Sequence, residues 1–403
     1  MFQFEYSHHP KYNFFQNPYF VSKFNVETFD ILYKKVGNAS NLSVVERDEL
    51  RIKLINLAKE VFNELCQQAE DIYERVFINE LKEAVVVLIE EELKFFYRKK
   101  KHINPKKTCE ILIDLRERRC HIGKISQQSI DKIHSISKNQ VELFRTNASF
   151  GRLTREDLSI NTGPLVSKIT KILNNEFKKQ GALDNLGQYM GTDYILGGCA
   201  LELSVPMSTW WRNKFKGIKA PETMYAHIDE SIGNPKAIIY LSNVGENNGP
   251  TEYYLGAYEA LKLNSLQELV GRVINVPGND TKSTLHQYYK REYHQVMSSE
   301  NMRKHFMRIP EIIRFNSHFG WDVVSGSAME NSLLKRKREV LGPQGTYILF
   351  DGSRLLHRGG LIEFGERLAL QAVFIPKPSL SYKLKSYPKR ALLKMQNLLK
   401  RSI

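Results

Sequence analysis

The segment GTYILFDGSRLLHRGGLIEFGERLALQAVFIP, residues 345–376, decides the fold class. It contains three short runs rich in β-branched, aromatic and aliphatic residues, and glycine-containing turns separate these runs. Runs of this length and composition are typical of β-strands. His357 lies at the end of the second run, and Arg367 opens the third. The segment therefore predicts three strands, with a polar side chain at the end of one and at the start of the next.

The same texture extends upstream to about residue 190. Further strand-like runs are YILGGCALELSVP (194–206), KAIIYLSNV (236–244) and PTEYYLG (250–256). Between residues 258 and 340 the pattern is a mixture of helical and irregular sequence. A long stretch of this kind between two groups of strands predicts an insertion.

The first third of the chain has a helical pattern instead. Residues 46–101 carry apolar side chains at three- and four-residue spacing, with neither proline nor glycine. Residues 126–145 are similar, and another helix is expected between Gly163-Pro164 and Gly181. We therefore predict an α+β protein in three parts: a mainly helical region (1–150), a β-rich domain (151–380) with the insertion 258–340, and a basic C-terminal tail (381–403).

Composition narrows the class of protein. The chain has 403 residues, of which 42% are hydrophobic, so it can build a substantial core. Its four cysteines form no CxxC pair, which argues against a disulfide scaffold or a zinc ribbon. The start lacks a signal-peptide pattern, and the longest apolar run is too short to span a bilayer. We expect a cytoplasmic protein.

The net charge of +15 favours anionic partners, but it does not choose among nucleic acid, lipid headgroups and small anionic metabolites. The insertion contributes many of the cations. We expect some of them to hold an anionic group of a substrate, and the candidates are Arg303, Arg308 and Arg314. The tail contains a short basic amphipathic segment, for which peripheral membrane contact is a minority alternative to docking on the domain.

The stretch YAHIDESIG, residues 225–233, places His227 and Asp229 two positions apart. On an extended chain, residues i and i+2 point to the same side, so an imidazole and a carboxylate can face one point. These are two of the three ligands of a facial iron site made of two histidines and one carboxylate. A bare HxD pair is more often a hydrogen-bonded surface pair, so the hypothesis depends on a third ligand.

His357 is the preferred third ligand, because Arg367 follows it ten residues later at the start of a strand. This spacing suits a co-substrate with two carboxylates. Its 2-oxo acid end would chelate the metal, and the arginine fork would hold its far carboxylate. His318 in FNSHFGWD is a rival, but no matching arginine follows it and no strand surrounds it. Asp351 in FDGS is expected to be a turn residue.

With these pieces in place, the chain resembles the iron(II)- and 2-oxoglutarate-dependent oxygenases, and among them the phytanoyl-CoA dioxygenase-like family. The matching pieces, in order, are HID (227–229), AIIYLSNVGENNGPTEYYLGAYE (237–259) and LLHRGGLIEFGERLAL (355–370). Together they cover roughly residues 190–376, about half of the chain. The resemblance implies a double-stranded β-helix, which is a jelly-roll or cupin-like fold.

The resemblance also implies roles for particular residues. His227, Asp229 and His357 would bind Fe(II). Arg367 would bind the distal carboxylate of 2-oxoglutarate, and Ile238 would lie beside this co-substrate. Dioxygen would be the second co-substrate.

Two positions narrow the expected reaction. Related halogenases have a small residue where this chain has Asp229, so hydroxylation or another oxidation is favoured over halogenation. The nucleic-acid demethylase branch usually has a second arginine where this chain has Val373, so nucleic acid is an unfavoured partner.

The expected function is therefore that of a 2-oxoglutarate-dependent dioxygenase. It would hydroxylate a C–H bond of a small, anionic metabolite and release succinate and CO₂. Two alternatives stay open. The chain could be a non-catalytic β-barrel scaffold that uses its basic surface for nucleic acid or membrane. It could also be an oxygenase that acts on a macromolecule, with the helical region as its docking module.

Overall fold

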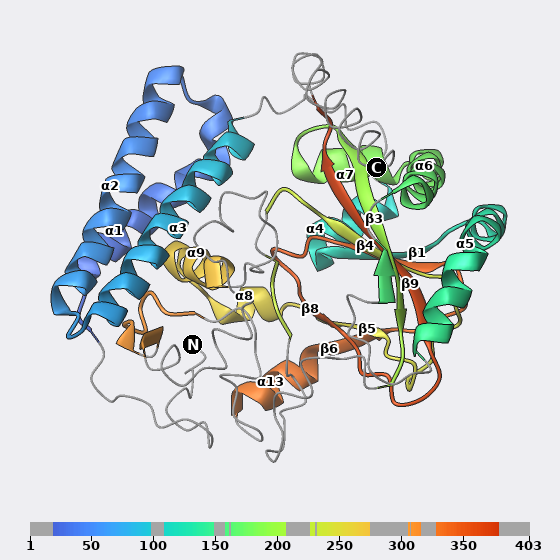
Figure 1. Ribbon diagram of the computed structural model, residues 1–403. Coiled ribbons are helices and arrows are strands. Elements are labelled where there is room, and N and C mark those ends of the chain that lie inside the picture. Colours follow the sequence, from blue (N-terminus) through green and yellow to red (C-terminus); the bar gives the residue numbers. More distant parts are fainter. Residues whose placement is uncertain are drawn as a thin grey trace, which may run out of the picture.

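The computed structural model describes residues 19–97, 109–148, 158–160, 163–206, 226–229, 232–274, 305–306, 308–315 and 328–378. Over these ranges the protein combines a helical bundle with two antiparallel sheets, which confirms the predicted α+β class (Figure 1). No helix within them is long and apolar enough to cross a membrane. The predicted basic tail, 381–403, lies outside the described residues.

The larger sheet has six antiparallel strands in the order β1-β7-β4-β9-β3-β2. Their bounds are β1 (Cys120–Lys124), β2 (Ser159–Ile160), β3 (Tyr194–Ser204), β4 (Lys236–Tyr240), β7 (Thr346–Phe350) and β9 (Arg367–Pro376). Strand β9 pairs with β3 along its whole length, ending with Arg367 opposite Ser204. Strand β1 comes from the region predicted to be mainly helical, and it pairs with β7 at one edge of the sheet.

The smaller sheet has three strands in the order β6-β5-β8. They are β5 (Thr251–Tyr254), β6 (Lys337–Val340) and β8 (Leu356–Gly359). Apolar side chains of both sheets form one buried cluster: Cys120, Tyr240, Val244, Val340, Ile348, Phe350, Leu355 and Ala369. The hydroxyl of Tyr240 on β4 donates to the carbonyl of Val340 on β6 at 2.9 Å. The two sheets therefore face each other around a common interior.

Helices cover the outer face of the larger sheet (Figure 1). They are α4 (Glu110–Arg118), α5 (Gln127–Ala148), α6 (Pro164–Lys179) and α7 (Ala182–Met190). Because strand side chains alternate between faces, Leu368 and Leu370 pack against these helices, while Ala369 points to the interior cluster. The helices predicted at 126–145 and between Gly163-Pro164 and Gly181 are confirmed as α5 and α6.

The N-terminal bundle contains α1 (Lys23–Lys34), the 3₁₀ helix η2 (Lys35–Asn41), α2 (Val44–Gln68) and α3 (Ile72–Phe96). The helical pattern over 46–101 is confirmed for most of its described part, but it gave no sign of the break between α2 and α3. Ala69 has an extended conformation, and the side chain of Asp71 accepts a hydrogen bond from the backbone N–H of Glu74 as the N-cap of α3. An aspartate cap can start a new helix without a proline or glycine signal.

The predicted insertion joins this bundle to the sheets. It contains α8 (Ala257–Leu261), α9 (Ser265–Ile274) and α13 (Ala328–Arg336), and it ends in β6. Helix α9 buries Leu266, Leu269, Val270 and Val273 in the core of the bundle. Arg272 of α9 forms a buried ion pair with Glu92 of α3 and a second ion pair with Glu268 at 3.0 Å. Helix α9 therefore packs as a further helix of the bundle.

Candidate metal centre

His227 and His357 lie side by side because their backbones pair. They form an isolated antiparallel bridge, in which each N–H donates to the other residue's carbonyl at 2.9 Å. Their ring centroids are 4.4 Å apart. The short segment around His227 thus extends the smaller sheet beyond β8, and it brings together two histidines that lie far apart in the sequence.

Asp229 completes the cluster. Its backbone N–H donates to the carbonyl of Gly352 at 2.7 Å, and the residue is only 3% exposed. Its Oδ1 lies 3.8 Å from Nε2 of both His227 and His357. One ligand atom from each of the three residues lies within 4.8 Å of the others. Metal bonds of about 2.1 Å separate two ligand atoms by up to about 4.2 Å, so the histidine–aspartate separations suit a metal ion.

His357 is held in the form that can bind a metal. Its Nδ1 lies 2.8 Å from the carbonyl of Leu355, which requires a proton on Nδ1 and leaves the lone pair on Nε2. Burial lowers the pKa of His357, although the negative charge of Asp229 opposes this. The ring of Phe350 packs against the ring of His357, and the two ring centroids are 4.6 Å apart. The neutral imidazole therefore directs its free nitrogen at Asp229.

Asp229 is ionised in spite of its burial. Burial alone would raise its pKa, but its electrostatic interactions, first with Lys236 and then with His357 and His227, outweigh this and hold the pKa below its usual value. The Nζ of Lys236 lies 2.6 Å from Oδ1. Within the described part of the chain, the buried Oδ2 has no hydrogen-bond partner. The oxygen that lies 3.8 Å from both imidazole nitrogens is Oδ1, whereas Oδ2 lies next to Gly352. An ionised carboxylate beside two imidazole nitrogens fits a divalent cation.

Lys236 was not among the residues singled out from the sequence. It is the first residue of β4, where strand alternation puts it on the same face as Ile238 and Tyr240. Ile238 is partly buried against the interior cluster. Its place beside 2-oxoglutarate stays a prediction. The alternation of side chains in KAIIY could have placed Lys236 on the interior face of the strand. It was passed over because a single lysine at a strand end is usually solvated.

Gly352 lies so close to Asp229 that it has no room for a side chain. A Cβ at this position would lie 1.8 Å from Oδ2 of Asp229. We expect Gly352→Ala to push the carboxylate out of place and to weaken Co(II) binding by about tenfold or more, as disturbed outer contacts of a metal site do. The measurement is a Co(II) titration of the metal-free protein. Gly198→Ala in β3 is the control, since a Cβ there meets nothing within 4 Å. Equal affinities in the two variants would contradict this account.

Arg367 lies in the same interior as the three residues of the cluster. It is 7% exposed, and its guanidinium donates to the carbonyl of Gly249 and, at 3.4 Å, to Oγ of Ser204. A Cβ on Gly359 would lie 3.5 Å from Nη2 of Arg367. Gly359 is two residues beyond His357 on the same face of β8, which corresponds to about 6.6 Å of strand. A short dicarboxylate can span such a distance.

Three arginines were predicted to hold an anionic group of the substrate: Arg303, Arg308 and Arg314. Arg303 and the rival ligand His318 lie outside the described residues. Arg314 is buried, and it donates to the carbonyl of Ile309 at 3.3 Å.

Arg308 is engaged within the N-terminal bundle. It is paired with Glu74 at 2.7 Å and with Glu70 at 2.8 Å, and it lies over the ring of Tyr19. Because carboxylates of its own chain balance its charge, we expect Arg308 to stabilise the bundle, and its role in substrate binding stays an untested prediction.

This placement changes the expected effect of removing Arg308. Arg308→Ala leaves Glu74 buried without its cation, which costs about 3 kcal/mol of folding free energy. Chemical denaturation should show this loss of stability. At denaturant concentrations too low to unfold the variant, its Co(II) affinity should equal that of the wild type. Lys23→Ala is the control, because Lys23 pairs with Glu27 on the exposed surface of the same bundle. If Arg308→Ala is as stable as the wild type and has a raised apparent KM for substrate, the result would support the prediction that Arg308 holds an anionic group of the substrate.

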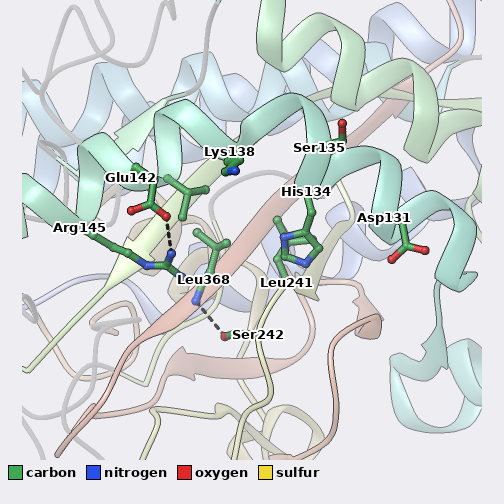
Figure 2. Close-up of a pocket in the computed structure, with 10 residues that line it drawn as sticks. Asp131, His134, Ser135, Lys138, Glu142, Arg145, Leu241, Ser242 and Leu368 are labelled. Carbon is green, nitrogen blue, oxygen red and sulfur yellow. Dashed lines mark hydrogen bonds and ion pairs between the residues drawn. The ribbon is translucent and has the colours of Figure 1, made fainter.

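A pocket of about 420 Å³ lies elsewhere, on the outer face of the larger sheet (Figure 2). Its wall on α5 includes His134 and Lys138, and its floor includes Leu241 and Leu368. Leu368 follows Arg367 directly, so the two side chains point to opposite faces of β9. This pocket is therefore separated from the metal cluster by the sheet.

Comparison with known proteins finds distant likenesses only. No family model matches the chain, and no curated protein matches its sequence. Similar solved structures include a non-heme alpha-ketoglutarate-dependent carbocyclase, SnoK, from nogalamycin biosynthesis (12% identity, 67% of this chain and 84% of that chain, TM-score 0.33). HygX from Streptomyces hygroscopicus, with nickel and 2-oxoglutarate bound, is similar at 13% identity (67% and 88% of the chains, TM-score 0.33). A non-heme monooxygenase, the ThoJ–nickel complex, is similar at 10% identity (66% and 77%, TM-score 0.33).

Two of these neighbours are described as non-heme enzymes, SnoK and ThoJ, and two descriptions, those of SnoK and HygX, name 2-oxoglutarate. At such low identities and TM-scores they do not determine the activity of this chain. The narrower resemblance to the phytanoyl-CoA dioxygenase-like family stays a prediction.

Proposed function

We propose that this protein is an Fe(II)- and 2-oxoglutarate-dependent oxygenase with a double-stranded β-helix core. The observation that carries the proposal is the cluster of His227, Asp229 and His357, with Arg367 buried in the same interior. Two facing antiparallel sheets around one interior support the proposed core. The finer proposals are the phytanoyl-CoA dioxygenase-like family, the domain limits given above, and hydroxylation of a small, anionic metabolite.

The three side chains of the cluster would hold the metal on one face. With these three side chains as ligands, the metal would keep sites for 2-oxoglutarate and dioxygen. When bound, Fe(II) and 2-oxoglutarate supply the oxidising chemistry, with succinate and CO₂ as co-products. The protein's own contribution is orientation: Leu355 holds the proton on Nδ1 of His357, and Lys236 holds the carboxylate of Asp229.

Arg367 would bind the far carboxylate of 2-oxoglutarate. A guanidinium is always charged and presents a planar fork that matches a carboxylate. Gly249 and Ser204 hold it from the protein side. Ile238 and Tyr240, on the same face of β4, would form the apolar wall along the carbon chain. This arrangement would place the 2-oxo end at the metal and keep water from the interior.

The proposal is tested by 2-oxoglutarate turnover. Purified protein is supplied with Fe(II), 2-oxoglutarate and air, with and without a panel of phosphorylated and carboxylated metabolites. We expect succinate to form only when both iron and 2-oxoglutarate are present, and one class of metabolite should stimulate it. The control is the variant with alanine at all three positions of the cluster. A wild-type protein that binds neither Co(II) nor 2-oxoglutarate, yet sediments with anionic vesicles or shifts DNA, would support the scaffold alternative.

A further inference from the structure

One short loop contacts two of the three proposed metal ligands. It is the connection from β7 to β8, residues 351–355, which we call the ligand loop. The carbonyl of Gly352 accepts the backbone N–H of Asp229 at 2.7 Å. The carbonyl of Leu355 lies 2.8 Å from Nδ1 of His357. The loop therefore contacts the backbone of Asp229 and the Nδ1 of His357, the nitrogen that carries the proton.

Asp351 determines the conformation of the ligand loop. It is 2% exposed, and its Oδ1 accepts hydrogen bonds from Oγ of Ser353 at 2.7 Å and from the backbone N–H of Ser353 at 3.2 Å. Its carbonyl accepts the backbone N–H groups of Arg354 and Leu355 at 3.0 and 2.9 Å. Side chain and main chain of one residue thus close the whole turn.

The second carboxylate oxygen of Asp351 attaches the loop to the layer of helices. The hydroxyl of Tyr189 on α7 donates to Oδ2 at 2.8 Å. Burial, followed by the negative charge of Asp351, raises the pKa of Tyr189 to about 12, so the hydroxyl stays a donor at neutral pH. Arg354 pairs with the same oxygen at 3.6 Å. The turn is therefore held both internally and from outside the sheets.

We propose that Asp351 is a positioning residue of the metal centre. This inference rests on the proposed function. Asp351 acts on Asp229 through Gly352 and on His357 through Leu355. It touches neither metal nor substrate. Without its carboxylate, buried donors of Ser353 and Tyr189 lose their acceptor, and the turn relaxes. Metal ligands tolerate displacements of only about 0.5 Å before the geometry is lost.

The test is a titration of metal-free protein with Co(II) alone, followed by the ligand-field absorption of the bound ion. We expect Asp351→Ala to bind Co(II) about 10- to 100-fold more weakly than the wild type, with shifted absorption bands. Asp351→Asn should recover much of the affinity and the wild-type bands. Its amide oxygen still accepts from Ser353, and its amide nitrogen can donate to the oxygen of Tyr189.

Glu176 provides a matched control for general loss of stability. It is a buried carboxylate on α6 that accepts from the backbone N–H of Ser126 at 3.1 Å and from the hydroxyls of Ser126 and Ser129 at 2.9 Å. It therefore closes a turn among the outer helices much as Asp351 closes the ligand loop. We expect Glu176→Ala to lower the unfolding temperature about as much, and to leave both Co(II) affinity and absorption unchanged.

The outcomes separate the two proposals. A folded Asp351→Ala protein with wild-type Co(II) affinity and spectrum overturns the positioning role while the proposed function stands. If Asp351→Ala does not fold, Ser353→Ala and Tyr189→Phe decide, because each removes a single hydrogen bond. Both should weaken Co(II) binding several-fold, and wild-type affinity in both would overturn the inference. A wild-type protein that binds no Co(II) overturns the proposed function, and this inference with it.

Discussion

Replacing His357 with alanine should abolish measurable metal binding and all succinate formation. The two remaining ligands cannot hold a facial site, and the loss should exceed the roughly 100-fold that removal of an outer contact costs. His357 is also the residue through which β8 pairs with the His227 segment, but alanine keeps that backbone pairing. The fold should therefore survive. Co(II) titration and iron content of the purified variant measure the effect.

Substitutions at two other histidines serve as comparisons for His357→Ala. His121 on β1 is buried and pairs with Asp114 through Nδ1 at 2.8 Å, in the larger sheet and outside the cluster. His121→Ala should cost stability and keep the metal. His318→Ala tests the rival ligand suggested by the sequence. Retained iron in His357→Ala together with lost iron in His318→Ala would show that the third ligand is wrongly assigned.

The second large effect is expected at Arg367. Arg367→Lys keeps the charge and loses the fork, so 2-oxoglutarate affinity should fall by about 2 kcal/mol, or about thirtyfold. Arg367→Met removes the charge and should cost about 3 kcal/mol or more, which is over 100-fold. Neither variant should lose Co(II). The measurement is 2-oxoglutarate binding to the Co(II)-loaded protein under anaerobic conditions.

Arg358 supplies the matched control for this experiment. It follows His357 on β8, points to the other face, and forms a bidentate pair with Glu252 at 2.8 and 2.9 Å. Arg358→Lys disturbs an equally buried guanidinium, so it should lower the unfolding temperature and leave 2-oxoglutarate affinity intact. If both lysine variants bind 2-oxoglutarate like the wild type, the far carboxylate is held elsewhere.

Several features of the site could be anticipated because they are local. The HxD spacing, the histidine at the end of a strand, and the arginine that opens the next strand are properties of short segments. Strand alternation then decides which of their side chains share a face. The helices at α5 and α6 were likewise predicted, since apolar periodicity and the Gly-Pro start are local signals. A cap such as Asp71 is equally local, but it is a weak signal within a long stretch of helical apolar periodicity, and the break between α2 and α3 was missed.

Other features depend on segments that are distant in the sequence. Lys236 matters because β4 lies where its ammonium meets Asp229. Arg308 looked like a substrate-binding cation because its sequence neighbourhood is basic, yet Glu74 of a distant helix balances it. Asp351 looked like an ordinary turn residue, and it is one, but the turn it closes contacts two proposed ligands. A sequence shows which residues are charged or favour turns, but it does not show which distant residues they will contact.

The sequence by itself determined the α+β class, the succession of a helical region and a β-rich region, and the set of residue types able to bind a metal and a dicarboxylate. These follow from periodicity and from side-chain chemistry, which act over a few residues. Only the tertiary structure decided that His227, Asp229 and His357 converge, that Arg367 faces the same interior, and that the ligand loop contacts two of the three. Convergence requires long-range backbone pairing and a shared core, and these form only when the whole chain buries its apolar surface.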